Sequence, residues 1–129
     1  MLRDEIRQAM SALTNSGNGG LEARFLFPPA FTGFQGHFPE APVLPGVCAV
    51  QAVLVMLETV RQRPVRLRRI AKAKFFAAVA PDEELLFVCR EERRVGGTTV
   101  VKASATVGNR KKAELSLEIA CDAAPPGSV

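Results

Sequence analysis

Hydrophobic positions recur every three or four residues near the start of the chain and every second residue over its last third. The first pattern comprises Leu2, Ile6, Ala9, Met10 and Leu13, and it predicts an amphipathic helix. The stretch NSGNGG that follows predicts a flexible turn, so residues 1–20 are interpreted as an N-terminal helix and turn. Residues 21–27 have strand character and end at a pair of prolines.

A second helix is predicted after Pro45 and Gly46. Its first eleven residues, 47–57, are apolar on every side except at Gln51. A helix without a polar face must be surrounded by other parts of the protein, so we expect this one at the centre of the domain. The preceding stretch, residues 31–46, is rich in Gly and Pro and is predicted to be a loop packed against the core.

Downstream of Pro64 the hydrophobic pattern has a period of two, which is typical of strands that are buried on one face. The predicted inner faces of the last two strands carry Thr99, Val101, Ala103, Ala105 and Val107, and then Ala113, Leu115, Leu117, Ile119 and Cys121. The alternating residues of the last strand, predicted to face solvent, are Lys112, Glu114, Ser116 and Glu118.

Turn signals at residues 81–82, 96–97 and 108–109 predict a run of antiparallel hairpins. One enclosed helix followed by a long antiparallel sheet indicates an α+β fold in which the sheet curls around the helix. A small curled sheet leaves an edge strand unpaired. A second copy of the chain would cover that edge, so we expect a homodimer.

Length and composition favour one ordinary globular domain. The 129 residues are 47% hydrophobic and 23% charged, which predicts a single domain over residues 1–129 with a disordered tail at 122–129. No apolar run reaches the roughly 18–20 residues that cross a bilayer, and the first residues do not resemble a signal peptide, so we expect a cytoplasmic protein without membrane contact. Cys48, Cys89 and Cys121 are expected to be reduced, buried thiols, with neither a disulfide nor a metal site.

The net charge of +4 is mild, but the positive residues are concentrated in one region, namely Arg61, Arg63, Arg66, Arg68, Arg69, Lys72 and Lys74. The chain has no Trp or Tyr and no recognisable nucleic-acid-binding motif, so nucleic acid is not an expected partner. An acidic protein or a phosphate-bearing group would fit the basic region, and so would a solvated surface with no partner.

The segment GFQGHFPEAPVLPGV, from Gly33 to Val47, resembles the active-site stretch of the 3-hydroxyacyl-acyl-carrier-protein dehydratases, which have the hotdog fold. The stretch RIAKAKFFAAVAPDEEL is also similar to that family, and the likeness covers residues 21–121. The resemblance implies removal of water from a 3-hydroxyacyl thioester on the phosphopantetheine arm of an acyl carrier protein, without metal or redox cofactor. It also implies a dimer whose pocket lies at the subunit boundary.

The residues of this segment suit that chemistry. A proton alpha to a thioester is only weakly acidic, and His37, the sole histidine, titrates near neutral pH as the required base would. The free backbone N–H groups at the helix start, near Gly46 and Val47, are expected to bind the developing enolate oxygen. Phe38 and Pro45 are the other expected substrate-binding residues.

The chain departs from the family's pattern at Gln51, where the motif spacing places the carboxylate that protonates the leaving hydroxyl. An amide can hold the hydroxyl but cannot donate a proton as an acid of ordinary strength. Three interpretations follow. His37 performs both proton transfers while Gln51 orients the substrate, or Glu58, two helical turns and about 10 Å further on, substitutes as the acid. In the third, the chain is an impaired subunit that needs a related partner.

Three functions therefore compete. The leading hypothesis is a dehydratase in fatty-acid biosynthesis or, by a looser likeness, in a polyene-type pathway. A thioesterase is the second, because the same fold supports thioester hydrolysis. The third is a non-catalytic subunit that binds acyl chains or the carrier protein. In that case an acyl tunnel could be lined by Phe31, Phe34, Phe38, Phe75 and Phe76, although ordinary core packing is the favoured explanation of these side chains.

Overall fold

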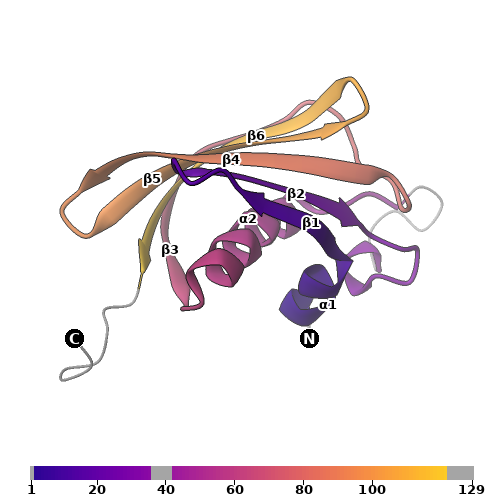
Figure 1. Ribbon diagram of the computed structural model, residues 1–129. Helices are drawn as coiled ribbons and strands as arrows, with labels where there is room; N and C mark the ends of the chain where they lie inside the picture. Colours follow the sequence, from indigo (N-terminus) through magenta and orange to yellow (C-terminus); the bar gives the residue numbers. More distant parts are fainter. Residues whose placement is uncertain (1, 36–41, 122–129) are drawn as a thin grey trace.

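An antiparallel sheet curls around one long helix (Figure 1). The computed structural model describes residues 2–35 and 42–121. In chain order the elements are α1 (Leu2–Ala9), β1 (Met10–Asn15), β2 (Gly20–Leu26), a short 3-10 helix η1 (Thr32–Phe34), α2 (Gly46–Arg61), β3 (Val65–Phe75), β4 (Glu84–Val95), β5 (Thr98–Val107) and β6 (Arg110–Cys121). The predicted tail, residues 122–129, lies outside the described residues.

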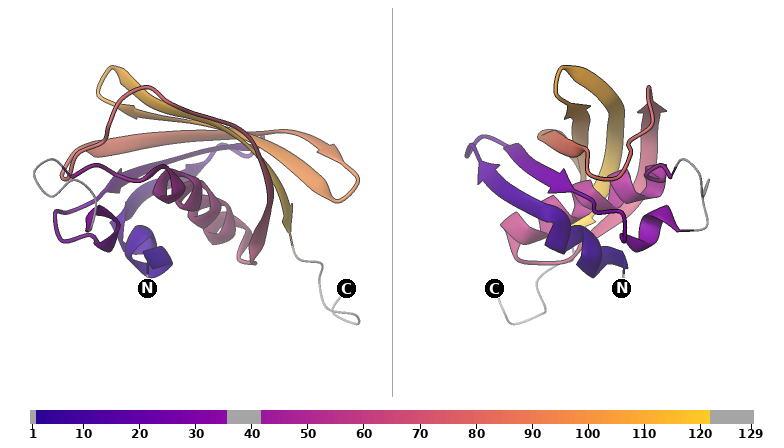
Figure 2. Two further views of the ribbon diagram at one scale, coloured as in Figure 1. Left: turned by 180° about the vertical axis from the view of Figure 1, so that it is seen from behind. Right: turned by 90° about the vertical axis from the view of Figure 1, so that its right-hand side faces the viewer.

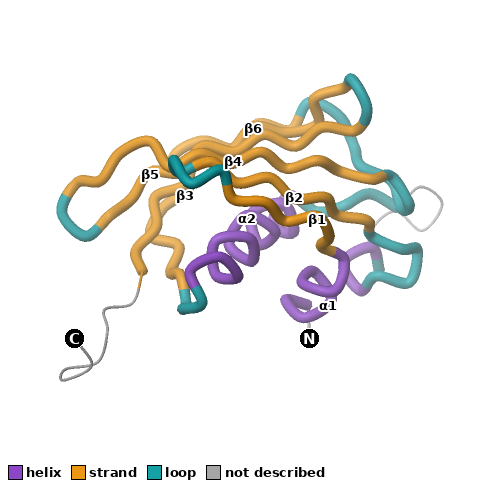
Figure 3. Tube along the Cα trace, in the orientation of Figure 1, coloured by secondary structure: helices purple, strands orange, loops and turns teal. Residues whose placement is uncertain are grey.

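The strand order across the sheet is β1-β2-β4-β5-β6-β3, and every neighbouring pair is antiparallel. The hairpins β4–β5 and β5–β6 turn at Gly96 and Gly108, whose φ angles of 61° and 57° suit glycine. Because β2 and β3 are distant in the sheet, α2 connects them across the concave face, where Figures 2 and 3 show it lying.

Burial of α2 explains why the sheet curls. Residues 48–50 and 52–57 of the helix are buried and pack against inward-facing side chains such as Phe25, Phe87 and Leu117, each 0% exposed. Removing this apolar surface from water is the main source of stability in such a core. The predicted central helix is confirmed, with one departure: Val47 is 58% exposed, so the enclosure begins one residue later.

The predicted N-terminal helix is only half correct. α1 ends at Ala9, and residues 10–15 form β1, which pairs with β2 from Met10↔Phe25 to Asn15↔Leu21. Residues such as Ser11 and Thr14 are weak helix formers, and pairing along β2 satisfies their backbone groups instead. The helix-like spacing of Met10 and Leu13 arose because a bulge interrupts β1, where Ala12 has a φ of 52°.

The alternation predicted for the last strand is wrong at Lys112 and at Ser116. Ser116 is 9% exposed and lies between its pairing partners Lys72 of β3 and Lys102 of β5. Ala105 pairs with Ala113 while Thr106 pairs with Lys111, so Lys112 is an extra residue in β6. A bulge of this kind re-aims the side chain of the inserted residue. Lys112 is accordingly buried, with 6% of its surface exposed.

Cross-strand ion pairs neutralise part of the basic region on the outer face of β3 and β6. Arg69 Nε lies 3.1 Å from Glu118, and Lys72 Nζ lies 3.2 Å from Glu114. Hydrogen bonds from Lys111 and Lys72 lower the pKa of Glu114 to about 2. Pairs as exposed as these contribute little to stability, but they reduce the positive charge that this surface presents.

Candidate active site

Four of the six predicted site residues are described. His37 and Phe38 lie outside the described residues, so their roles stay predictions. Pro45, Gly46, Val47 and Gln51 all belong to the first turns of α2 or to the residue that precedes it.

A cavity of about 440 Å³ opens at the start of α2. This volume is within the range of small-molecule sites. Pro45 and Gly46 line it, as the sequence predicted for a binding site, whereas neither Val47 nor Gln51 is among its lining residues. The full lining comprises residues 43–46 and 75–79 together with Ala49, Leu85, Phe87, Ala105, Lys112 and Ala113.

Small side chains create this space. Ala105 of β5 and Ala113 of β6 are directly paired across the two strands, and Ala49 faces the cavity from α2. Where neighbouring inward positions carry alanine instead of leucine or phenylalanine, the sheet and the helix cannot fill the volume between them. The cavity is therefore a consequence of side-chain size on three elements, and its lining is mostly apolar.

The start of α2 has backbone donors with no side-chain cap. The N-cap residue Pro45 makes no side-chain cap hydrogen bond, and its carbonyl accepts from the N–H of Cys48 at 2.9 Å. The N–H groups of Gly46 and Val47 come before that bond and have no partner within the helix. Together with the helix dipole they favour a negatively charged oxygen at this end of the cavity.

The ring of Phe75 leaves no space for a side chain at position 46. A Cβ atom on Gly46 would lie 2.7 Å from Cζ of Phe75, closer than van der Waals contact allows. Because glycine has no Cβ atom, another group can approach the start of α2 closely at this position. In the structure the ring of Phe75, itself 51% exposed, takes that position.

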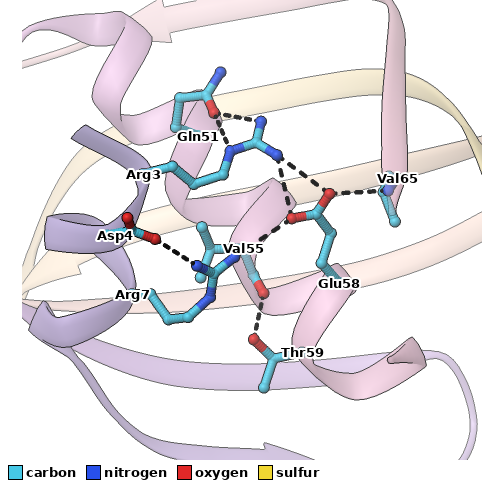
Figure 4. Close-up of polar contacts among 8 residues, drawn as sticks. All are labelled: Arg3, Asp4, Arg7, Gln51, Val55, Glu58, Thr59 and Val65. Carbon is cyan, nitrogen blue, oxygen red and sulfur yellow. Dashed lines mark hydrogen bonds and ion pairs between the residues drawn. The ribbon is translucent and has the colours of Figure 1, made fainter. Parts of the chain in front are cut away.

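Gln51 faces α1. Its side-chain oxygen Oε1 accepts hydrogen bonds from Arg3 Nε at 3.0 Å and from Arg3 Nη2 at 2.6 Å (Figure 4). Hydrogen bonds to a charged donor are stronger than neutral ones. The amide is thus joined to the N-terminal helix. The sequence offered no signal for Arg3, because residues 51 and 3 lie far apart along the chain.

Glu58 connects three elements. Its carboxylate accepts two hydrogen bonds of 3.2 Å from Arg3 Nη1 of α1 and one of 2.9 Å from the N–H of Val65 of β3. Arg7 Nη2 lies 3.8 Å away, and the Glu58 side chain is 14% exposed. With its oxygens occupied in this way, Glu58 serves to join α1, α2 and β3.

Lys112 is the one charged residue among the described residues that line the cavity. Its Nζ donates to the carbonyl of Ala78 at 2.9 Å and lies 3.8 Å from Glu83 Oε1. The ammonium group therefore holds the loop between β3 and β4 against the first residues of β6. Sequence alternation placed this lysine in solvent, because a bulge cannot be recognised from the spacing of hydrophobic residues.

The phenylalanines divide into two sets. Phe31 and Phe34 belong to the buried core, where the ring of Phe31 lies 4.7 Å from that of Phe27 and 5.6 Å from that of Phe34. Phe75 and Phe76 line the cavity. Phe38 lies outside the described residues; of the other four phenylalanines proposed for an acyl tunnel, Phe75 and Phe76 are in a position to contact a ligand in that cavity.

Thiol chemistry is not available at Cys48 or Cys89. Both are buried and free, and burial raises the pKa of Cys48 to about 11 and that of Cys89 to about 12, so both are protonated near neutral pH.

In the described part of the chain, no group of three or more His, Cys, Asp and Glu side chains is arranged to hold a metal ion. No helix there is long and apolar enough to cross a membrane.

The profile of the ApeI-like family, described as ApeI dehydratase, matches residues 13–119. The chain belongs to the ApeI-like dehydratase family. Among curated proteins it is 33% identical over 94 residues to the 3-hydroxyacyl-acyl-carrier-protein dehydratase FabZ of Clostridium novyi, covering 67% of this chain and 66% of that one. It is 32% identical over 95 residues to FabZ of Streptococcus pyogenes, covering 68% of each. The match spans 66% of the C. novyi protein and 61% of the FabZ of Clostridium kluyveri, which is less than two thirds of each.

Solved structures confirm the hotdog fold predicted for this dehydratase-family chain. The dehydratase heterocomplex ApeI:P from Xenorhabdus doucetiae matches with a TM-score of 0.75 at 17% identity, covering 86% of this chain and 96% of that one. A homologue of HP0420 from Helicobacter felis matches with a TM-score of 0.68 at 16% identity, covering 88% and 89%. Both show a curled sheet around a central helix as a common architecture.

Replacing Lys112 tests its role in closing the cavity. Lys112→Met keeps a side chain of similar volume but removes the hydrogen bond from Nζ to the carbonyl of Ala78, and a hydrogen bond from a charged group contributes about 1.5–3 kcal/mol. Urea unfolding followed by circular dichroism should report a destabilisation of that size. The neighbouring Lys111→Met is the control, because Lys111 is exposed and bonds only at the surface. An unchanged unfolding midpoint for Lys112→Met would show that the buried ammonium does not anchor the loop.

Proposed function

We propose that this protein dehydrates 3-hydroxyacyl thioesters carried on an acyl carrier protein to trans-2-enoyl thioesters, in fatty-acid or polyene-type biosynthesis. The observation that carries the proposal is the apolar cavity at the uncapped start of α2, in a chain of the dehydratase family. Such a cavity suits an acyl chain, and the helix start suits the thioester oxygen. The FabZ relatives are named for this substrate class.

The reaction divides into two proton transfers. His37, acting as the base, takes the proton from the carbon alpha to the thioester, and the electron pair moves onto the carbonyl oxygen. The N–H groups of Gly46 and Val47 stabilise that oxygen as charge develops. The electrons then return to form the carbon–carbon double bond while the C–O bond at the beta carbon breaks, and the hydroxyl leaves with a proton as water.

The second proton in this proposal comes back from His37. Gln51 cannot supply it, because an amide has no proton of suitable acidity. Glu58 is engaged with Arg3, Arg7 and the N–H of Val65, and it lies two turns beyond Gln51. An imidazolium that has just accepted a proton is an acid of the right strength near neutral pH, so one residue can serve both steps.

Turnover and its dependence on His37 test the proposal directly. Purified protein should convert a 3-hydroxyacyl thioester to the enoyl product, followed by the absorbance of the conjugated thioester, and His37→Ala should lower kcat/KM by about 10²-fold or more. A thiol-reactive dye run in parallel would detect hydrolysis. Thiol release without enoyl product would establish a thioesterase instead. Binding of acyl-carrier protein with neither product would establish a non-catalytic subunit, and undiminished turnover by His37→Ala would remove that residue from the mechanism.

The cavity should set the preferred acyl length. Ala105→Leu places a larger side chain on its sheet side, and overpacking a filled site costs about 1–3 kcal/mol. We expect kcat/KM for an eight-carbon substrate to fall about tenfold or more, while kcat/KM for a four-carbon substrate, whose shorter chain should end before Ala105, changes little. An equal loss for both lengths would mean that the acyl chain does not enter this cavity.

The free edge of β3 suits a second chain. β3 pairs only with β6 among the described strands, and apolar side chains beside that edge are exposed: Ile70 at 47%, Phe76 at 54% and Val47 on α2 at 58%. Pairing the edge with another β3 would satisfy its backbone groups and cover this surface. A second copy is the proposed occupant. A related chain is the alternative, as the X. doucetiae neighbour is a heterocomplex.

Light scattering after size-exclusion chromatography tests this assembly. The wild-type protein should have twice the 13.9 kDa mass of one chain, and Ile70→Glu should have the mass of one chain because it places a charge in an apolar contact. Leu26→Glu, on β2 at 45% exposure, is the matched control and should stay a dimer. A monomeric wild type would exclude the homodimer, and a dimeric Ile70→Glu would place the interface elsewhere.

A further inference from the structure

Lys112 is a buried charge in the wall of a mostly apolar cavity. It is 6% exposed, and it is the one charged residue among the described residues that line the cavity at the start of α2. Its Nζ donates to the carbonyl of Ala78, which belongs to the same wall. Burying an ammonium group costs free energy unless its donors are used. A plain hydrocarbon chain in the cavity would use none of them.

The ammonium group has donors to spare. It carries three N–H groups and no acceptor, and within the described residues one acceptor lies at hydrogen-bond distance, the carbonyl of Ala78 at 2.9 Å. Glu83 Oε1 is 3.8 Å away, too far for a hydrogen bond but close enough to balance the charge. This part of the wall therefore offers N–H donors while its net charge is close to zero.

Glu83 is held where it is by the backbone of its own loop. Its Oε1, the same oxygen that faces Lys112, accepts a hydrogen bond of 2.8 Å from the N–H of Ala80. A ligand carboxylate beside Lys112 would meet this fixed negative charge, and like charges placed together cost affinity. A neutral oxygen, such as that of a hydroxyl group, meets no such repulsion.

The cavity thus has hydrogen-bond donors at two places. One is the start of α2, at Gly46, and the other is the ammonium group of Lys112 from β6. The loop between β3 and β4 connects them, because Val79 accepts from the N–H of Leu44 at 2.8 Å while Ala78 accepts from Lys112. A ligand with two oxygens separated by apolar carbons would match this arrangement.

We propose that Lys112 is a specificity-determining residue that binds a neutral oxygen on the acyl chain of the substrate, and that Glu83 excludes a carboxylate from the same place. This inference rests on the proposed dehydratase function and names its substrate class, 3-hydroxyacyl thioesters with a further hydroxyl group along the chain. The thioester oxygen accepts from the start of α2, and the further oxygen accepts from Lys112. No covalent bond forms or breaks at Lys112.

Matched acyl chains test this specificity. The substrates are 3-hydroxyacyl thioesters of six to ten carbons that end in a methyl, a hydroxyl or a carboxylate group, each on the same acyl carrier protein. They are compared in the wild type, Lys112→Met, Glu83→Gln and the control Lys111→Met, whose lysine bonds at the surface. The readout is the ratio of kcat/KM for two chain ends within one variant. A general loss of stability in Lys112→Met lowers both values and cancels in the ratio.

We expect the wild type to favour the hydroxyl end over the methyl end by about tenfold or more at one of these lengths, because a hydrogen bond from a charged donor is worth that much. Lys112→Met should reverse the preference, since the hydroxyl then has no partner in an apolar cavity, and Lys111→Met should retain it. Glu83→Gln keeps an acceptor for Ala80 but removes the negative charge. It should raise the relative kcat/KM of the carboxylate end by about tenfold.

Equal kcat/KM values for the methyl and hydroxyl ends at every length would overturn the inference and leave the dehydratase function in place. So would a hydroxyl preference that survives in Lys112→Met, or a wild type that favours the carboxylate end. Calorimetric titration with saturated pantetheine thioesters bearing the same three ends separates the two proposals. If the wild type forms no enoyl product but binds the hydroxyl-ended thioester more tightly, and Lys112→Met does not, the proposed function is wrong and the ligand class assigned to Lys112 stands.

Discussion

Burial of α2 by the curled sheet is the constraint on which the other features of this protein depend. A helix with apolar residues on nearly all sides is stable in water only when something covers each side, and here the strands do so from β2 round to β3. The start of the helix then lies at one end of the concave surface. The cavity forms there because Ala49, Ala105 and Ala113 leave the enclosure incompletely filled.

The one face of α2 that the sheet does not cover carries the polar residues Gln51 and Glu58. The side-chain oxygen of Gln51 and the carboxylate of Glu58 both accept hydrogen bonds from Arg3 of α1, and Glu58 also accepts one from the N–H of Val65 in β3. The residue at the position of the family's acid is therefore bound to a cation of the N-terminal helix. Two parts of α2 therefore have different surroundings. Its first turn lines the cavity, and the face that carries Gln51 and Glu58 packs against α1.

Much of the fold could be predicted from the sequence, and so could part of the candidate site. Period-two alternation located β5 and β6, and the apolar run located α2, because these patterns are imposed directly by burial on one or all faces. The GHFP and PVLPGV segments identified the family and led to Pro45 and Gly46, which line the cavity. The sequence failed at Met10–Asn15, where strand pairing outweighed a helix-like spacing.

What the sequence by itself determined is the enclosed helix and the curled antiparallel sheet around it, since each follows from the local order of polar and apolar residues. The tertiary structure alone decided the direction of Gln51, the partner of Glu58 and the burial of Lys112. The reason is that these depend on contacts between residues up to 55 positions apart and on a single inserted residue in β6. Neither leaves a trace in the spacing of hydrophobic residues along the chain.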